Sequence, residues 1–362
     1  MTRIYLTLTA CILLASCTTK KVSTDTKYPD NEHKIDSIIE LMTIEEKIGQ
    51  MTQIDQQFLV KDSHISKYGI GSLLSGGGST PDVNEFSSWA DMYDNFQSIA
   101  LKSRLGIPLI YGIDAVHGHN NVYGATIFPH NVGLGCANDY ELTREISEAT
   151  AIEVAATGIN WDFSPCIAIP QDERWGRHYE GYSEDGEIVA NLGEASIIGY
   201  QTETLGSSNI SVLACAKHFI GDGATEWGTG MDNQADKIDR GNALLTDSLI
   251  RAKYLPPYIK AIDAGVGTVM ASFNSINGLK CHANGYLFND LLKTELAFDG
   301  FVISDWRGID EIPGDFKSDI ITSINAGIDM VMVPGDTIWC GEHYLDFLRL
   351  FQVAIEEESI AM

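Results

Sequence analysis

The chain has 362 residues, of which 44% are hydrophobic and 20% charged, so it can bury a large core and is not expected to be intrinsically disordered. Its formal net charge of −26 at pH 7 repels phosphate backbones and anionic lipid surfaces, which excludes nucleic acid as an expected partner. A neutral or cationic ligand is compatible with this charge, and so is an acidic surface that only keeps the protein soluble.

The first 31 residues are typical of an export signal and a linker. Arg3 precedes an apolar run at 4–15 that is too short for a stable transmembrane helix, and the run leads into Leu14-Ala15-Ser16-Cys17. These four residues resemble a bacterial lipobox. We therefore predict a signal peptide at 1–17 and an exported lipoprotein, periplasmic or on the cell surface, that touches the membrane only through a lipid on Cys17. Residues 18–31 predict a flexible tether, and the domain is expected at 32–362.

Two amphipathic helices are predicted at the start of this domain. Apolar residues from Ile35 to Met42 fall on one helical face, and the spacing Thr43-x-x-Glu46 is a capping box that opens a second helix through Met51. After them, short apolar runs alternate with amphipathic helices. Strands are predicted at 71–74, 109–113, 159–163, 212–216, 268–272, 301–303 and 330–333, and helices at 83–105, 140–156, 185–205, 246–263, 287–296 and 320–326.

This alternation predicts an α/β fold with parallel strands. Apolar runs without a polar face are typical of strands buried on both sides. A (β/α)8 barrel is the favoured architecture, and a doubly wound sheet is the alternative.

Polar residues follow four of the predicted strands. In a parallel α/β barrel the active site lies at the carboxyl ends of the strands, so these residues are expected to meet. A single carboxylate at such a place can simply cap a helix or hold a loop. Several carboxylates, cations and a histidine on one rim favour a site for a hydroxyl-rich ligand. The residues are Asp114, Lys217, His218 and Asp305, with Arg174, Arg177 and Glu180 on the loop after the strand predicted at 159–163.

Other chemistries lack their motifs in this sequence. His117 and His119 are two residues apart, which does not match the helical spacing of a zinc protease, and neither a phosphate-binding loop nor a serine elbow is present. We therefore expect no metal and no cofactor. Acid–base chemistry by carboxylates remains, and glycoside hydrolysis is a common use of it. The cysteines beyond the signal, Cys136, Cys166, Cys215, Cys281 and Cys340, show no metal-ligand spacing and leave a disulfide open.

At these same positions the sequence strongly resembles glycoside hydrolase family 3, from about residue 35 to about residue 335. The resemblance rests on long motifs in a fixed order. They are Leu41 to Met51, Gly112 to Asn120, Ala125 to Asn131, Arg174-Trp175-Gly176-Arg177, Glu180 to Asp185, Lys217 to Gly223, and Gly300 to Trp306.

The resemblance implies a retaining β-glucosidase or exo-β-glucan glucohydrolase. Asp305 matches the nucleophile that attacks the anomeric carbon. The substrate implied is a β-glucoside or β-glucan oligosaccharide with a terminal non-reducing β-D-glucosyl residue. Residues implied to contact the sugar are Asp114, Arg177, Lys217 and His218, with Phe273 and Trp306 as aromatic contacts that ordinary core packing would explain equally well.

The resemblance also implies that part of the machinery is missing from this chain. In two-domain members the general acid comes from a second α/β sandwich domain, which we do not find before Met362, so we expect a truncated fragment with little activity alone. Local substitutes are Glu184, Asp222 and Glu226.

Three other functions stay open at this point. One is a sugar-binding protein with impaired catalysis. Another is an N-acetyl-β-hexosaminidase of the same family, which the loop at 221–226 argues against because it lacks the expected histidine. The third is an aldolase-like barrel with Lys217 as a Schiff base.

Overall fold

The computed structural model describes residues 29–202, 204–231, 236–333 and 343–361. The predicted signal peptide, the predicted lipidation site Cys17 and Cys340 lie outside these residues. The chain divides into two units, 1–41 and 42–362. None of the helices in the described ranges combines the length and the apolar character needed to cross a bilayer.

The first unit contributes one helix, α1 (Pro29–Leu41). It begins three residues before the predicted start of the domain. A proline is well tolerated in the first turn of a helix, where its missing N–H has no partner to lose. Met42, which we placed on the same face, belongs to the second unit.

The second unit opens with the predicted capping box, which is confirmed. The Thr43 hydroxyl accepts a hydrogen bond from the Glu46 N–H at 3.3 Å, and the Glu46 carboxylate accepts one from the Thr43 N–H at 2.9 Å. These bonds satisfy N–H groups at the start of α2 (Ile44–Gln50), which would otherwise lack partners. The helix leads directly into the first strand.

The strands form parallel sheets, as the alternation predicted. One sheet has five strands in the order β11-β1-β2-β3-β4, and a second has three in the order β10-β7-β5. A small third sheet joins β6 (Asn242–Ala243), β8 (Ser275–Ile276) and β9 (Leu279–Lys280). The strands of the two parallel sheets are β1 (Thr52–Asp55), β2 (Ser72–Ser75), β3 (Ile110–Ile113), β4 (Trp161–Asp162), β5 (Cys215–Phe219), β7 (Thr268–Ala271), β10 (Phe301–Ile303) and β11 (Val331–Met332).

The α/β class with parallel sheets is therefore confirmed. In the described residues, however, the continuously hydrogen-bonded parallel strands form two sheets and not one closed barrel. Isolated parallel bridges connect Trp161 to Leu213 and Ile303 to Met330, at the outer edges of both sheets. The closed (β/α)8 barrel stays a prediction at this point.

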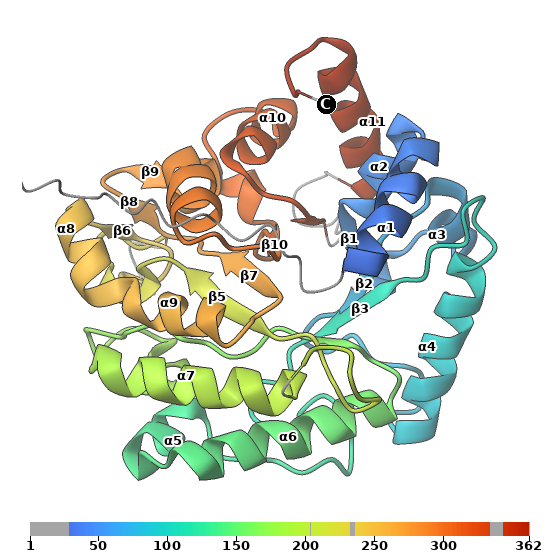
Figure 1. Ribbon diagram of the computed structural model, residues 1–362. Helices are drawn as coiled ribbons and strands as arrows, with labels where there is room; N and C mark the ends of the chain where they lie inside the picture. Colours follow the sequence, from blue (N-terminus) through green and yellow to red (C-terminus); the bar gives the residue numbers. More distant parts are fainter. Residues whose placement is uncertain (1–28, 203, 232–235, 334–342, 362) are drawn as a thin grey trace, which may run out of the picture. The chain divides into compact units, whose positions relative to one another are not determined.

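Helices cover the sheets between the strands (Figure 1). The predicted helix at 246–263 is broken into α8 (Asp247–Leu249), a π-helix at Ile250–Tyr254 and α9, because Pro256 and Pro257 have no N–H for a continuous ladder. Figure 1 shows α7 lying between α6 and α9, and both pack against it. The other helices are α3 (Ser63–Tyr68), α4 (Phe86–Ala100), α5 (Asn131–Ala137), α6 (Tyr140–Ala156), α7 (Gly186–Gln201), α9 (Pro256–Asp263), a π-helix at Tyr286–Glu295, α10 (Phe316–Ala326) and α11 (Tyr344–Glu356).

Candidate active site

The carboxyl ends of β3, β5 and β10 bring the predicted polar residues together. Asp114 follows β3 directly, and Asp305 comes two residues after β10. Lys217 and His218 lie inside β5 and not after it, so the predicted end of this strand at residue 216 was wrong. The strand continues because Cys166 bridges to Lys217 and Phe219 still pairs with Ala271 of β7.

The first pair in the site is Lys217 with Asp114. The Lys217 Nζ lies 2.8 Å from the Asp114 Oδ1, and the Lys217 side chain is only 5% exposed, against 45% for Asp114. Burial opposes the charge on the ammonium group, but the carboxylates of Asp114 and Glu180 outweigh it and raise the pKa of Lys217 above its ordinary value. A Schiff-base lysine must react as the neutral amine, so this geometry disfavours the aldolase alternative.

The second pair joins the loop after β4 to the histidine of β5. Arg177 donates from Nε and Nη2 to both carboxylate oxygens of Glu180, at 2.7 and 2.8 Å. Its Nη2 also lies 2.9 Å from the Nε2 of His218. A bidentate pair of this kind fixes the plane of the guanidinium group. Arg177 therefore reaches the strand-end histidine in a defined orientation.

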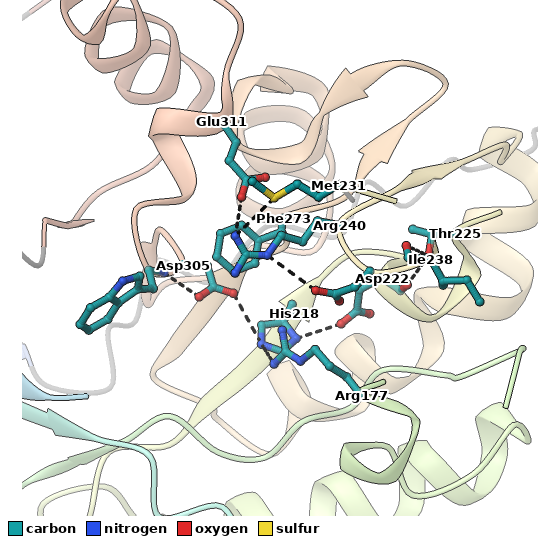
Figure 2. A network of polar contacts seen from close by, with 12 residues as sticks. Arg177, His218, Asp222, Thr225, Met231, Ile238, Arg240, Phe273, Asp305 and Glu311 are labelled. Atoms are coloured by element: carbon teal, nitrogen blue, oxygen red, sulfur yellow. Dashed lines mark hydrogen bonds and ion pairs between the residues drawn. The ribbon is translucent and has the colours of Figure 1, made fainter. Parts of the chain in front are cut away.

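His218 is the centre of the polar network in Figure 2. Its Nδ1 lies 2.9 Å from the Asp222 Oδ2, while its Nε2 lies 3.7 Å from the Asp305 Oδ2. Burial, followed by the nearby charges of Arg177 and Lys217, holds the pKa of His218 well below its ordinary value. The imidazole is therefore neutral at pH 7.

Asp305 presents one free oxygen to the site. Its Oδ1 accepts a hydrogen bond from the Trp306 N–H at 2.6 Å, and its own N–H donates to the His282 Nε2 at 3.0 Å. Its Oδ2 is buried and accepts no hydrogen bond from any described residue. Burial raises the pKa of Asp305 to about 6, against the opposing charge of Arg177.

A second buried carboxylate, that of Asp55, lies near the ring of Trp306, the residue that follows Asp305. The Asp55 Oδ2 accepts from the Gly76 N–H at 2.9 Å, and its Oδ1 accepts from the Ser79 hydroxyl at 2.8 Å. A Cβ at Gly76 would lie 2.6 Å from the Cζ3 of Trp306, so only glycine allows this close approach. Asp55 thus holds the loop against which the Trp306 ring packs, and we did not predict this role.

An aromatic residue lies at another edge of the network. Phe273 is buried, and the guanidinium carbon of Arg240 lies 3.9 Å from the centre of its ring. Arg240 also donates to Glu311 at 2.6 Å, and Glu311 accepts from Lys280 at 2.8 Å. One face of the Phe273 ring is therefore occupied by a cation held in place by its own carboxylate.

This geometry can be compared with known proteins. The model of the glycosyl hydrolase family 3 N-terminal domain matches residues 43–358. The chain belongs to glycosyl hydrolase family 3. The family resemblance that we read from the motifs is thereby confirmed.

Relatives in this family include enzymes from bacteria and a slime mould. A lysosomal β-glucosidase of Dictyostelium discoideum is 33% identical over an alignment that covers 83% of this chain and 39% of the relative. A periplasmic β-glucosidase of Salmonella typhimurium is 29% identical over 82% of this chain and 37% of the relative. A mutant exo-1,3/1,4-β-glucanase from a Pseudoalteromonas species superposes with a TM-score of 0.83 at 41% identity, covering 92% of this chain and 52% of that one. A mutant Listeria innocua β-glucosidase solved with laminaribiose has a TM-score of 0.74 at 29% identity, and the match covers 91% of this chain and 44% of that one. The chain thus spans about two fifths of the length of these curated relatives.

The structure brings together five of the residues that the family resemblance implied. Asp114 pairs with Lys217, while Arg177 and His218 reach toward Asp305. Phe273 lies at the edge beyond Arg240, and Trp306 contributes its backbone N–H to the nucleophile candidate while its ring packs over the Gly76 loop.

The remaining candidates in this family member lie elsewhere. Glu184 and Glu226 are exposed, and Arg174 pairs with Asp172 and covers the ring of Trp227 at 4.0 Å. Asp222 is buried on the far side of the His218 ring from Asp305 (Figure 2), so it does not face the nucleophile candidate as a direct proton donor would. Within the described residues no cluster of three or more metal-ligating side chains occurs.

Sequence reasoning missed Asp55, Asp162, Arg240, His282 and Glu311. A usable signal existed only for Asp162, which stands beside Trp161 at the end of a predicted strand. The other four come from segments without an apolar run. His282 lies in a short 3₁₀ helix, and Arg240 lies in a loop with a positive φ of 56°.

Proposed function

We propose that this site hydrolyses terminal non-reducing β-D-glucosyl residues of β-glucosides or β-glucans by a retaining mechanism, with Asp305 as the nucleophile. One observation carries the proposal. The Asp305 Oδ2 is buried, accepts no hydrogen bond from the described residues, and lies beside Arg177 and His218. A carboxylate oxygen in that state is available to form a covalent bond to an anomeric carbon.

The other polar groups suit the binding of sugar hydroxyls. Asp114 is partly exposed and can accept hydrogen bonds, while Lys217 beside it can donate. Arg177 and Lys217 are each neutralised by a carboxylate of their own, so an uncharged sugar fits better than an anion. Fixing several hydroxyls around the reacting carbon orients the ring for attack.

The relatives support this proposal, since they are named as β-glucosidases and an exo-β-glucanase, and two structures of the Listeria enzyme hold laminaribiose and glucose. The retaining mechanism also needs a general acid, which is a second carboxyl group roughly 5 to 5.5 Å from the nucleophile.

The test is covalent trapping with a 2-deoxy-2-fluoro-β-glucoside that carries a dinitrophenyl leaving group. Such a group departs without protonation, so the outcome does not depend on the general acid. Mass spectrometry of a protein digest should find the label on the peptide that contains Asp305. Asp305→Asn should remove the label, and Asp91→Asn, an exposed change on α4, should keep it. A label on another carboxylate would contradict the proposal.

Two alternative outcomes would change the assignment. If no label forms but glucose still binds in calorimetry and Asp114→Ala abolishes binding, the chain is a sugar-binding protein. If a chromogenic N-acetylglucosaminide is turned over faster than the matching glucoside, the hexosaminidase alternative is favoured.

We also propose that the strands of the two parallel sheets close into one (β/α)8 barrel. The bridges Trp161 to Leu213 and Ile303 to Met330 support this, because they link the edges of the sheets. A single buried cluster, which includes Trp161, Met270 and Ile303, draws side chains from both sheets. A crystal structure in which these edges carry no continuous hydrogen bonding would contradict closure.

Finally, we propose that the protein is exported and anchored through an acylated Cys17. The lipobox-like run ahead of this cysteine supports the proposal. Metabolic labelling with an alkyne fatty acid in a bacterial host should mark the full chain. Cys17→Ser should lose both the label and the membrane fraction, and a membrane-bound Cys17→Ser protein would contradict the anchor.

A further inference from the structure

The ring of His218 is held from both of its nitrogens. Its Nδ1 lies 2.9 Å from the Asp222 Oδ2, and its Nε2 lies 2.9 Å from the Arg177 Nη2 (Figure 2). The residue is 2% exposed, so water does not exchange with these two partners freely. The positions of the hydrogens on this ring therefore follow from what the partners can donate and accept.

Arg177 and Asp222 together decide which nitrogen carries the proton. A guanidinium group has only donors, so the His218 Nε2 at 2.9 Å must accept and cannot bear a hydrogen. A neutral imidazole then carries its single hydrogen on Nδ1, and that N–H donates to the Asp222 Oδ2. The other Asp222 oxygen, Oδ1, accepts from the Gly223 N–H at 3.0 Å. Both oxygens of Asp222 thus act as acceptors, which suits a carboxylate.

The tautomer matters because the same Nε2 faces the nucleophile candidate. The Nε2 lies 3.7 Å from the Asp305 Oδ2, the oxygen that accepts no hydrogen bond among the described residues. A hydrogen on Nε2 would make this nitrogen a donor 3.7 Å from the Asp305 Oδ2. A hydrogen bond to that oxygen would lower its reactivity toward carbon, since it would occupy the attacking lone pair.

We propose that Asp222 is a positioning residue that fixes His218 as the Nδ1–H tautomer and so keeps the Asp305 Oδ2 free to attack. This inference rests on the proposed function, in which Asp305 is the nucleophile. Asp222 does not touch the sugar in this arrangement, because the imidazole ring lies between it and Asp305.

The charges around the ring agree with a neutral, singly protonated His218. Arg177 and Lys217 both disfavour a second proton on the ring, as does the nearby His282. These two cations are themselves paired with carboxylates, Arg177 with Glu180 and Lys217 with Asp114. A doubly protonated imidazole would place one N–H against the donors of Arg177, which the 2.9 Å contact excludes.

The kinetic test is Asp222→Asn, assayed by the rate of glycosylation with a dinitrophenyl β-glucoside. An amide has one acceptor and one donor, so it cannot accept from both His218 and Gly223 as the carboxylate does. If its NH2 faces the ring, the hydrogen moves to Nε2. The wrong histidine tautomer costs about 10⁴-fold in the kcat of a Ser-His-Asp triad, and we expect a loss of about 10²-fold or more here, with a smaller change in KM.

The matched control is Thr225→Val. The Thr225 hydroxyl donates to the main-chain carbonyls of Asp222 and Ile238, at 3.3 and 2.8 Å, so it ties down the same loop without touching His218. If Asp222 acts only by supporting the loop, Thr225→Val should lower the rate as much as Asp222→Asn does. We expect instead that the control keeps a rate within a few-fold of the unaltered chain.

The direct test is nitrogen-15 NMR of histidine-labelled protein, which distinguishes a protonated from an unprotonated ring nitrogen. The His218 signal, assigned by its loss in His218→Gln, should show Nδ1 protonated and Nε2 bare in the unaltered chain. A hydrogen on Nε2 there would overturn the proposal, whether or not Asp222→Asn folds. If the spectrum shows the expected tautomer while Asp305 is never trapped, the proposed function fails and the tautomer assignment stands. An Asp222→Asn protein with full glycosylation rate would overturn the positioning role.

Discussion

The buried carboxylate of Asp162 should make the stability of the protein fall as the pH rises. Its side chain is fully buried at the end of β4, where Oδ1 accepts from the Ala115 N–H at 2.8 Å and Oδ2 accepts no hydrogen bond within the described structure. Burial raises the pKa of Asp162 to about 7, against the opposing hydrogen bond from Ala115. In the unfolded chain an Asp titrates near 3.9, roughly three units lower.

The sign follows from proton binding. Between these two pKa values the folded protein holds a proton on Asp162 that the unfolded chain has lost, so this stabilisation is complete below about pH 4 and disappears as the pH passes 7. Integrated from pH 5 to pH 8, one such group lowers the free energy of unfolding by about 2.5 kcal/mol.

Asp162→Asn removes the titration of this carboxyl group. The amide oxygen can still accept from Ala115, while the amide NH2 takes the place of the unbonded oxygen at a cost that is the same at every pH. Urea denaturation at pH 5, 6, 7 and 8 gives the free energies of both proteins. The variant should gain about 2.5 kcal/mol on the unaltered chain across this range, and Asp91→Asn, on the exposed face of α4, should gain nothing. A difference between Asp162→Asn and the unaltered chain that stays constant from pH 5 to 8 would refute the reasoning.

Three further predictions concern the site. Asp114→Asn takes the carboxylate away from the buried ammonium of Lys217. Because Asp114 itself is partly exposed, we expect a loss of about 1 to 3 kcal/mol in urea denaturation, part of which Lys217→Met in the same chain should restore; an unchanged midpoint would contradict the pair's role. The glycosylation rate with a dinitrophenyl glucoside should fall as the pH drops below about 6, because burial raises the pKa of Asp305 to about 6 and only its carboxylate attacks; a flat profile from pH 5 to 8 would count against Asp305. Arg240→Met uncovers one face of Phe273 and should cost about 1 kcal/mol in thermal unfolding, whereas no change would mean that the contact at 3.9 Å contributes nothing.

Strands with apolar runs were predictable, and the one parallel-sheet strand without such a run was missed. β1 contains Thr52, Gln53 and Asp55, all buried, and only Ile54 is apolar. These polar side chains are tolerated inside because each finds a partner that the sequence does not reveal; Gln53, for example, donates to the Ser72 hydroxyl of β2 at 2.8 Å. A rule based on hydrophobic runs cannot find such a strand, since the hydrogen bonds that compensate its burial exist only after folding.

The candidate site was predictable as a set of positions but not as a network. Asp114 and Lys217 are separated by 103 positions along the chain, and only the fold brings them to 2.8 Å, since β3 and β5 belong to different sheets. The rule that active residues follow parallel strands identified both of them. The rule could not indicate that Asp222, four residues after His218, forms a hydrogen bond with the His218 ring. That contact depends on the conformation of the loop that follows β5.

The charged pairs of the site leave free the Asp305 oxygen that we propose as the nucleophile. Each buried cation has its own carboxylate: Arg177 has Glu180, and Lys217 has Asp114. Asp305 is left without a salt-bridge partner of the lysine or arginine type in the described structure, and the Nε2 of His218 lies 3.7 Å from its Oδ2. A carboxylate held in this way is both more basic and less solvated than one in an ion pair, since its burial outweighs the charge of the nearby Arg177. Those are the properties that a nucleophile for an uncharged sugar needs. The neutral state of His218 is therefore as important to the site as the charge of Asp305.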